Sequence, residues 1–166
     1  MSKDLMFQDE IKNAVREAYG SISSGAGEPV VGLLYSDEEV AELPAGAREW
    51  ALGVGNPVRY AFLQPGEVAL DIVEAMCDRA RANAADAGVA AWTEFLHGEM
   101  EQIPLPDASV DVVISNGVLN LSGRKSRALA EIFRVLKPGG RISLADLTVE
   151  GELPPEIAND QSAWAG

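Results

Sequence analysis

Residues 110–115 (VDVVIS) constrain the fold most, because four of these six residues are apolar and β-branched. A nearly continuous apolar run of this length is typical of a strand that is buried on both faces of a parallel sheet. The amphipathic stretch 124–136 follows it, KPGG at 137–140 ends that pattern, and 141–147 is again apolar. A strand, a helix and a second strand in this order predict a right-handed βαβ unit.

The same alternation is expected earlier in the chain. Residues 68–70 predict a short strand that leads into Asp71. Residues 74–87 predict a helix that ends before Gly88, and residues 92–96 predict another strand. The region 68–147 therefore indicates an α/β domain around a mostly parallel sheet.

The N-terminal part of the chain predicts helices. Residues 5–19 place apolar side chains at helical spacing. Ser36 and Glu39 have the spacing of a capping box, which predicts a short helix that ends near Leu43. Residues 45–66, with several turn signals, are expected to be irregular.

The charge and the scarcity of two residue types exclude several function classes. Thirteen Lys and Arg against 26 Asp and Glu give a formal charge of −13, which argues against binding to nucleic acid or to an anionic membrane. Cys77 and His97 are the single residues of their types, so a multi-thiolate or histidine-rich metal site is not expected. No signal peptide and no apolar run of the ~20 residues that span a bilayer is visible, so a cytoplasmic location is expected.

The polar residues that end the strands are the first candidates for a site. In an open parallel sheet, ligands bind outside the carboxyl ends of the strands. The residues at these positions are Asp71, Glu99, Ser115, Asn116, Asn120 and Asp146. An acid there can accept hydrogen bonds from a ribose hydroxyl or an adenine amino group. The alternative is that acids end strands because solvent begins there.

Two stretches resemble a known family. Residues 99–116 (EMEQIPLPDASVDVVISN) and 134–142 (RVLKPGGRI) resemble the middle and the last core turn of class I S-adenosylmethionine-dependent methyltransferases. Further stretches resemble the arsenite methyltransferase-like branch: 16–20 (REAYG), 35–39 (YSDEE), 53–57 (GVGNP), 114–121 (ISNGVLNL) and 151–154 (GELP). The resemblance implies a reduced Rossmann-like methyltransferase fold. It also implies one domain over residues 1–166, with a helical or lid region at 1–64, a core at 65–150 and a tail at 151–166.

One departure from this family concerns the cofactor. Family members carry a glycine-rich loop, a helix and a second strand after the first strand, whereas Asp71 here leads directly into the helix predicted at 74–87. About 25 to 30 residues of the pattern are absent, judged from the usual size of a βαβ unit. Asp71 therefore matches either the first-strand acid or the ribose-binding acid. Gly53-Val54-Gly55 precedes the strand and is not expected to replace the loop.

A second departure concerns the acceptor. Arsenite methyltransferases hold trivalent arsenic through thiolates, because soft sulfur suits a soft centre. The resemblance places those thiolates at Val54 and Gly117, and neither is a cysteine. Arsenite is therefore not expected as the substrate, and Cys77 is interpreted as a packing residue.

A third departure concerns the sheet. The usual strand order of this fold is 3-2-1-4-5-7-6, and this chain is expected to keep about four strands, in the order 3-X-4-5. The strand at 141–147 then becomes an open apolar edge. We expect self-association through it into a homo-oligomer such as a homodimer, with strand or element exchange as one route.

Individual residues keep two interpretations each. His97 could act as a general base or be a polar loop residue, and Asn116 and Asn120 could orient an acceptor or satisfy loop backbone groups. The resemblance makes Tyr19 part of a lid over the cofactor, against a helix packed permanently on the sheet. It makes Asp71, Glu99, Ser115 and Asn116 cofactor-binding candidates. The expected function is S-adenosylmethionine-dependent methyl transfer to a small molecule. The alternatives are a non-catalytic relic that binds a partner, and a scaffold reused for another reaction.

Overall fold

A computed structural model describes residue 10, residues 12–14, residue 17 and residues 27–41, 43–71, 77–148 and 150–151. Tyr19 and much of the helix expected at 5–19 lie outside the described residues, although residues 10, 12–14 and 17 are helical. The tail expected at 151–166 is described only at its first residue.

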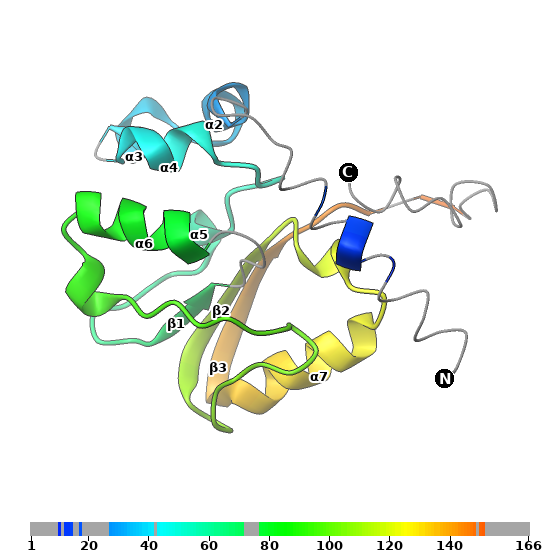
Figure 1. The fold of residues 1–166 in the computed structure, drawn as a ribbon. Coiled ribbons are helices and arrows are strands. Elements are labelled where there is room, and N and C mark those ends of the chain that lie inside the picture. Colours follow the sequence, from blue (N-terminus) through cyan, green and yellow to red (C-terminus); the bar gives the residue numbers. More distant parts are fainter. Residues whose placement is uncertain are drawn as a thin grey trace.

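The centre of the molecule is a parallel sheet in the order β1-β2-β3 (Figure 1). Its strands are β1 (Ala69–Asp71), β2 (Val110–Asn116) and β3 (Leu136–Ala145). Helix α7 (Lys125–Val135) connects β2 to β3, which confirms the βαβ unit predicted from the sequence. The reduced Rossmann-like α/β fold is therefore the observed one.

The two faces of β2 are covered by different parts of the chain. Successive side chains of a strand point to opposite faces. On one face of β2, Val113 packs with Ile132 and Val135 of α7. Val112 and Ile114 pack on the other face against Ala61, which follows α5 (Pro57–Tyr60). The apolar run of β2 is thus explained by burial on both faces.

The KPGG stretch lies within β3, where a turn was expected. Val110 of β2 pairs with Leu136, and two residues later Val112 pairs with Arg141. Residues 137–140 therefore form a bulge between these two pairs. A turn-like sequence is therefore compatible with a strand here, because residues 137–140 lie in the bulge and do not pair with β2.

Short helices precede the sheet. They are α2 (Glu28–Leu34), α3 (Asp37–Val40) and α4 (Ala45–Glu49), and α6 (Cys77–Asp86) follows β1 (Figure 1). The capping box of α3 is confirmed: Ser36 Oγ accepts from Glu39 N, and Glu39 Oε2 accepts from Ser36 N. Helix α4 packs on α6, where the Arg79 guanidinium lies 3.2 Å from the centre of the Trp50 ring.

The expectation that residues 45–66 are irregular was wrong for two short helices, α4 and α5. Helix α5 begins because the Asn56 side chain accepts a hydrogen bond from Arg59 N, and because Pro57 occupies the first turn. Pro44 is the residue immediately before α4, without a side-chain cap. Four- and five-residue helices leave too little periodicity to be found by pattern alone.

The strand predicted at residues 92–96 was also wrong. Residues 90–92 form the short helix η1 (Ala90–Trp92), and residues 93–98 have no regular structure. Thr93 is extended, but Thr93 Oγ1 donates to Val89 O and Phe95 O accepts from the Arg81 guanidinium. These side-chain bonds replace strand pairing. The described part of the chain therefore contains three strands where about four were expected.

No helix within the described ranges is long and apolar enough to cross a membrane.

Candidate functional site at the carboxyl edge of the sheet

The carboxyl ends of the three strands lie side by side. Asp71 pairs in register with Ile114, and Asn116 pairs with Ala145. Ser115 and Asn116 thus end the central strand between Asp71 on one side and Asp146 on the other. This is the edge at which ligands bind in open parallel sheets.

The Asn116 side chain is fully engaged by the loop at residues 53–55. Its Oδ1 accepts hydrogen bonds from Val54 N at 2.9 Å and Gly55 N at 3.1 Å, and its Nδ2 donates to Gly55 O at 2.8 Å. The loop therefore lies across the carboxyl ends of β2 and β3. Of the two interpretations of Asn116, this geometry favours the one in which it satisfies loop backbone groups.

Two glycines allow this close approach. A Cβ atom on Gly53 would lie 2.0 Å from Asn116 Nδ2, and one on Gly55 would lie 2.5 Å from Ala145 Cβ. The space that these glycines leave is filled by the sheet itself. Gly53-Val54-Gly55 is therefore a packing loop, and its geometry gives no cradle for a cofactor.

The two positions where the resemblance places thiolates are neighbours in space. A Cβ atom on Gly117 would lie 3.3 Å from Val54 Cγ1. Gly117 has a backbone φ of +68°, a conformation that residues other than glycine adopt only with strain. Here the pair presents a methyl group and a bare backbone, with no sulfur ligand.

Two buried oxygen atoms near the end of β2 have no hydrogen-bond partner among the described residues. They are Ser115 Oγ and Asn120 Oδ1. Ser115 is 1% exposed, and buried hydroxyls are normally paired with protein or water. Unsatisfied polar atoms at a strand end are the kind of group that a bound ligand completes.

Two charged side chains, Asp146 and Lys125, hold the turn after β2. Asn120 N donates to Asp146 Oδ2, and Lys125 Nζ donates to the carbonyl oxygens of Asn120 and Ser122. Burial lowers the pKa of Lys125, and the nearby Asp146 carboxylate opposes that shift. These bonds fix the backbone of the turn and leave the Asn120 side-chain oxygen unpaired.

His97 and Glu99 lie in another place, a groove of about 630 Å³ between the 97–104 loop and α7. Its walls are His97, Gly98, Glu99, Gln102, Ile103 and Pro104 on the loop, and Arg127, Glu131 and Arg134 on α7. Glu99 forms an ion pair with Lys12 at 2.7 Å. His97 is exposed.

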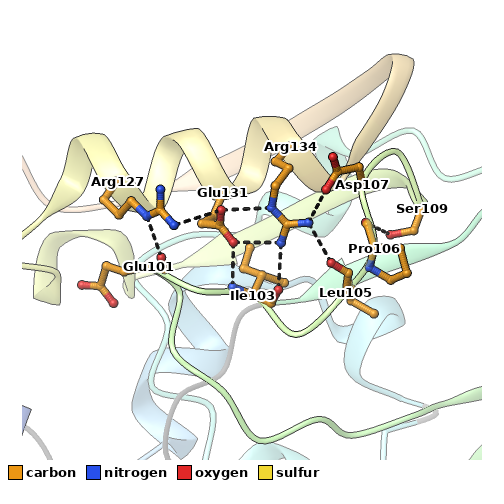
Figure 2. Close-up of polar contacts among 9 residues, drawn as sticks. All are labelled: Glu101, Ile103, Leu105, Pro106, Asp107, Ser109, Arg127, Glu131 and Arg134. Atoms are coloured by element: carbon orange, nitrogen blue, oxygen red, sulfur yellow. Dashed lines mark hydrogen bonds and ion pairs between the residues drawn. The ribbon is translucent and has the colours of Figure 1, made fainter.

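Figure 2 shows how α7 holds this loop. The Glu131 carboxylate accepts from Ile103 N at 3.1 Å and from the Arg134 guanidinium at 2.8 and 3.0 Å. Arg134 also donates to the carbonyl oxygens of Ile103 and Leu105 and to Asp107. We call these interactions the Arg134 clasp. Its guanidinium holds the pKa of Glu131 below the ordinary value, against the opposing effect of burial.

Sequence reasoning missed Lys12, Glu101 and the Arg134 clasp as parts of this region. Glu101 is 7% exposed, and the Ser122 hydroxyl donates to its Oε1 at 2.6 Å. The spacing of Glu131 and Arg134, three residues apart on a helix, was a visible signal for an ion pair. Nothing in the sequence indicated that Lys12 would meet the 97–104 loop.

The described residues include groups of the type that the nucleoside part of S-adenosylmethionine requires, at the carboxyl edge and on the loop beside α7. The unpaired Ser115 Oγ and the acid Glu99 are the donor and acceptor types that hydroxyl and amino groups of a nucleoside require. Among the described glycines at the carboxyl edge, Gly53, Gly55 and Gly117 face Asn116, Ala145 and Val54, so they form no open cradle for the methionine part. Ser115 at the carboxyl edge would hold one part of the nucleoside, and Glu99, on the loop that borders the groove beside α7, is a separate candidate.

Comparison with known proteins identifies the family. A methyltransferase domain model matches residues 49–144, which is more than half of the chain. An arsenite methyltransferase of Halobacterium salinarum is 32% identical over 160 residues, covering 81% of this chain and 40% of that protein. A ubiquinone/menaquinone biosynthesis C-methyltransferase of Ectopseudomonas mendocina is 40% identical over 88 residues, covering 52% of this chain and 34% of that protein.

One solved structure agrees on the fold. A putative sarcosine dimethylglycine methyltransferase from Galdieria sulphuraria aligns with a TM-score of 0.50 at 20% identity, covering 84% of this chain and 59% of that one. The chain spans less than half the length of the two curated relatives named above. The resemblance predicted from the sequence is confirmed: this chain belongs to the methyltransferase family and is similar to its arsenite methyltransferase-like members.

Proposed function

We propose that the chain binds S-adenosylmethionine at the carboxyl edge of β1 and β2 and transfers its methyl group to a small-molecule acceptor. The observation that carries the proposal is Ser115 Oγ, a buried oxygen without a partner at the end of the central strand of a methyltransferase-family domain. The cofactor supplies an electrophilic sulfonium carbon, so the protein has mainly to align it with the nucleophile. Asp71, at the end of β1, and Glu99, on the loop that borders the groove beside α7, are the further proposed cofactor contacts.

A pair of buried serines tests this proposal. Ser115→Ala removes an oxygen that bonds to nothing described, so it should leave folding stability unchanged and weaken S-adenosylhomocysteine binding in calorimetry. Ser143→Ala is the matched control, because Ser143 Oγ donates to Pro57 O and takes no part in the proposed site. Ser143→Ala should lower stability and leave affinity unchanged. Equal affinities in Ser115→Ala and wild type would contradict the placement of the cofactor.

We propose an acceptor other than arsenite. Val54 and Gly117 stand together where the resemblance places thiolates, and neither supplies the soft sulfur that trivalent arsenic requires. His97 and Asn120 remain the proposed acceptor-side residues, with His97 as a base and Asn120 offering an unpaired side-chain oxygen. Asn116 contributes by holding the loop at residues 53–55.

A non-catalytic role is the second candidate, and one observation favours it. The Asn116 side chain forms hydrogen bonds with the backbone of the 53–55 loop, and Glu99 forms an ion pair with Lys12. Two proposed site residues therefore already have protein partners. A folded chain that gives no heat with either S-adenosylmethionine or S-adenosylhomocysteine would support this role or a scaffold reused for another reaction.

We also propose that two copies associate through β3. This strand pairs with β2 on one side only among the described residues. Its outer residues Ile142 and Leu144 are 41% and 42% exposed, although they share a face with buried Val113 and Ser115. Asp111 and Glu67 neutralise the charges of Lys137 and Arg141 within the protomer. The repulsion between these cations in two copies of β3 is therefore reduced. Separately, we propose a cytoplasmic location and no binding to nucleic acid.

A further inference from the structure

Lys12 lies between two carboxylates of the loop that holds Glu99. Its ammonium nitrogen is 2.7 Å from Glu99 Oε2 and 3.8 Å from Glu101 Oε2. This lysine belongs to the described N-terminal helical segment, which is blue in Figure 1. A residue far away in the sequence thus reaches the acid that the proposed function assigns to the cofactor.

The two carboxylates differ in what they need. Glu101 is buried, and its Oε2 has no hydrogen-bond partner among the described residues, whereas its Oε1 accepts from the Ser122 hydroxyl. The Glu99 side chain is about half exposed, so water can solvate it. A buried carboxylate oxygen gains more from a nearby ammonium group than an exposed one does. Glu101 Oε2 is therefore a second acceptor within a short movement of Lys12.

Lys12 occupies one of the directions from which a ligand can approach the Glu99 carboxylate. The Glu99 oxygen that Lys12 contacts at 2.7 Å cannot at the same time accept an equally close hydrogen bond from a ligand along that direction. An ion pair with a half-exposed partner is weak, so a ligand can displace it at low cost. We propose that Lys12 competes with the cofactor for Glu99 and moves onto Glu101 when the cofactor binds. This inference rests on the proposed function, since it takes the cofactor as the competing ligand.

Calorimetry with S-adenosylhomocysteine tests the competition. Lys12→Gln should bind about threefold more tightly than wild type, because a partly exposed ion pair no longer has to be broken. Lys3→Gln makes the same change in net charge and serves as the matched control, with an affinity equal to that of wild type. An affinity of Lys12→Gln equal to or weaker than that of Lys3→Gln would overturn the competition.

A second measurement follows Lys12 without replacing it. The chain has four lysines, so an amine-acylating reagent and mass spectrometry can give the modification rate of each. In Glu101→Gln the second carboxylate is gone and only a neutral amide oxygen remains to receive Lys12, so saturating S-adenosylhomocysteine should raise the rate at Lys12 several-fold. In wild type the rate should stay low with or without ligand. Lys137, paired with Asp111, is the internal reference. An unchanged Lys12 rate in ligand-saturated Glu101→Gln would contradict the movement.

The two proposals fail in different ways. Absence of heat in wild type and Lys12→Gln alike contradicts both the proposed function and the competition. Binding of equal strength in wild type and Lys12→Gln supports cofactor binding and overturns the competition alone. Binding in Lys12→Gln with no heat in wild type supports both.

Discussion

Asn116 and Gly55 bond to each other in both directions: Asn116 Oδ1 accepts from Gly55 N at 3.1 Å, and Asn116 Nδ2 donates to Gly55 O at 2.8 Å. Asparagine is suited to this contact, because its side-chain amide presents one acceptor and one donor in a single plane. The pair joins the end of the central strand to a loop that comes 61 residues earlier in the chain.

Asn116→Ala should destabilise the fold by about 1–3 kcal/mol, since it removes three hydrogen bonds and leaves loop backbone groups unpaired. Urea unfolding followed by circular dichroism measures the effect. Asn116→Asp keeps the acceptor and loses the donor, so it should destabilise the fold as well. If Asn116→Ala unfolds at the same urea concentration as wild type, Asn116 does not hold the loop.

The fold could be predicted where the pattern is long and regular. The apolar run of β2 and the amphipathic helix α7 identified the βαβ unit, because burial on two faces and on one face leaves distinct periodicities. The strand expected at residues 92–96 could not be excluded in this way. The side-chain bonds from Arg81 to Phe95 O and from Thr93 to Val89 O depend on contacts that the sequence does not show.

The location of the candidate site at the carboxyl edge of the sheet could be predicted, but the contacts of its residues could be predicted less well. The topological rule for parallel sheets identified Ser115 and Asn116 at the carboxyl end of β2, and both are there. The rule gave no means to foresee that Asn116 bonds to Gly55, or that Lys12 pairs with Glu99, because both contacts join distant parts of the chain. His97 lies in the groove beside α7, where its exposed side chain contributes to the wall.

Acid should weaken the fold through the Arg134 clasp. Arg134 lowers the pKa of Glu131 below its ordinary value of 4.5, so the folded state favours the ionised carboxylate. A lowered pKa in the folded state contributes stability that is fully present above the ordinary value and is lost as the pH falls through the folded value. Urea midpoints should therefore fall as the pH is lowered below about 4.5.

Glu131→Gln is the variant that assigns this pH dependence. It should be less stable than wild type at pH 7 and lose less stability on acidification, because the titrating carboxylate is gone. Glu94→Gln removes an exposed acid outside the clasp and should follow the wild-type profile. If Glu131→Gln and wild type lose stability in parallel between pH 7 and pH 3, the clasp is not the source of the acid sensitivity.

Charge on the outer strand should abolish self-association. Ile142→Lys places an ammonium group on the exposed edge next to Leu144, where pairing with a second copy would bury it. Size-exclusion chromatography with light scattering should give an oligomer for wild type and a monomer for Ile142→Lys. Val58→Lys changes an exposed apolar residue of α5 and should leave the oligomer intact. A monomeric wild type at micromolar concentration would contradict the pairing.

Arsenite should not bind at the Val54–Gly117 contact. Tryptophan fluorescence of the wild type is expected to stay unchanged on addition of arsenite, because no sulfur ligand stands at either position. Cys77→Ser should give the same null response, which tests whether the single thiol contributes. A saturable change in wild type that is absent from Cys77→Ser would show arsenite binding by a route this arrangement does not provide.

The central claim is that the edge formed by Asp71 and Ser115 binds the nucleoside that S-adenosylmethionine and S-adenosylhomocysteine share. The most direct measurement is calorimetric titration of the folded wild-type chain with S-adenosylhomocysteine. The account predicts saturable heat with one site per chain. No heat at a ligand concentration on the order of 1 mM, with the far-UV spectrum of a folded chain, would contradict it.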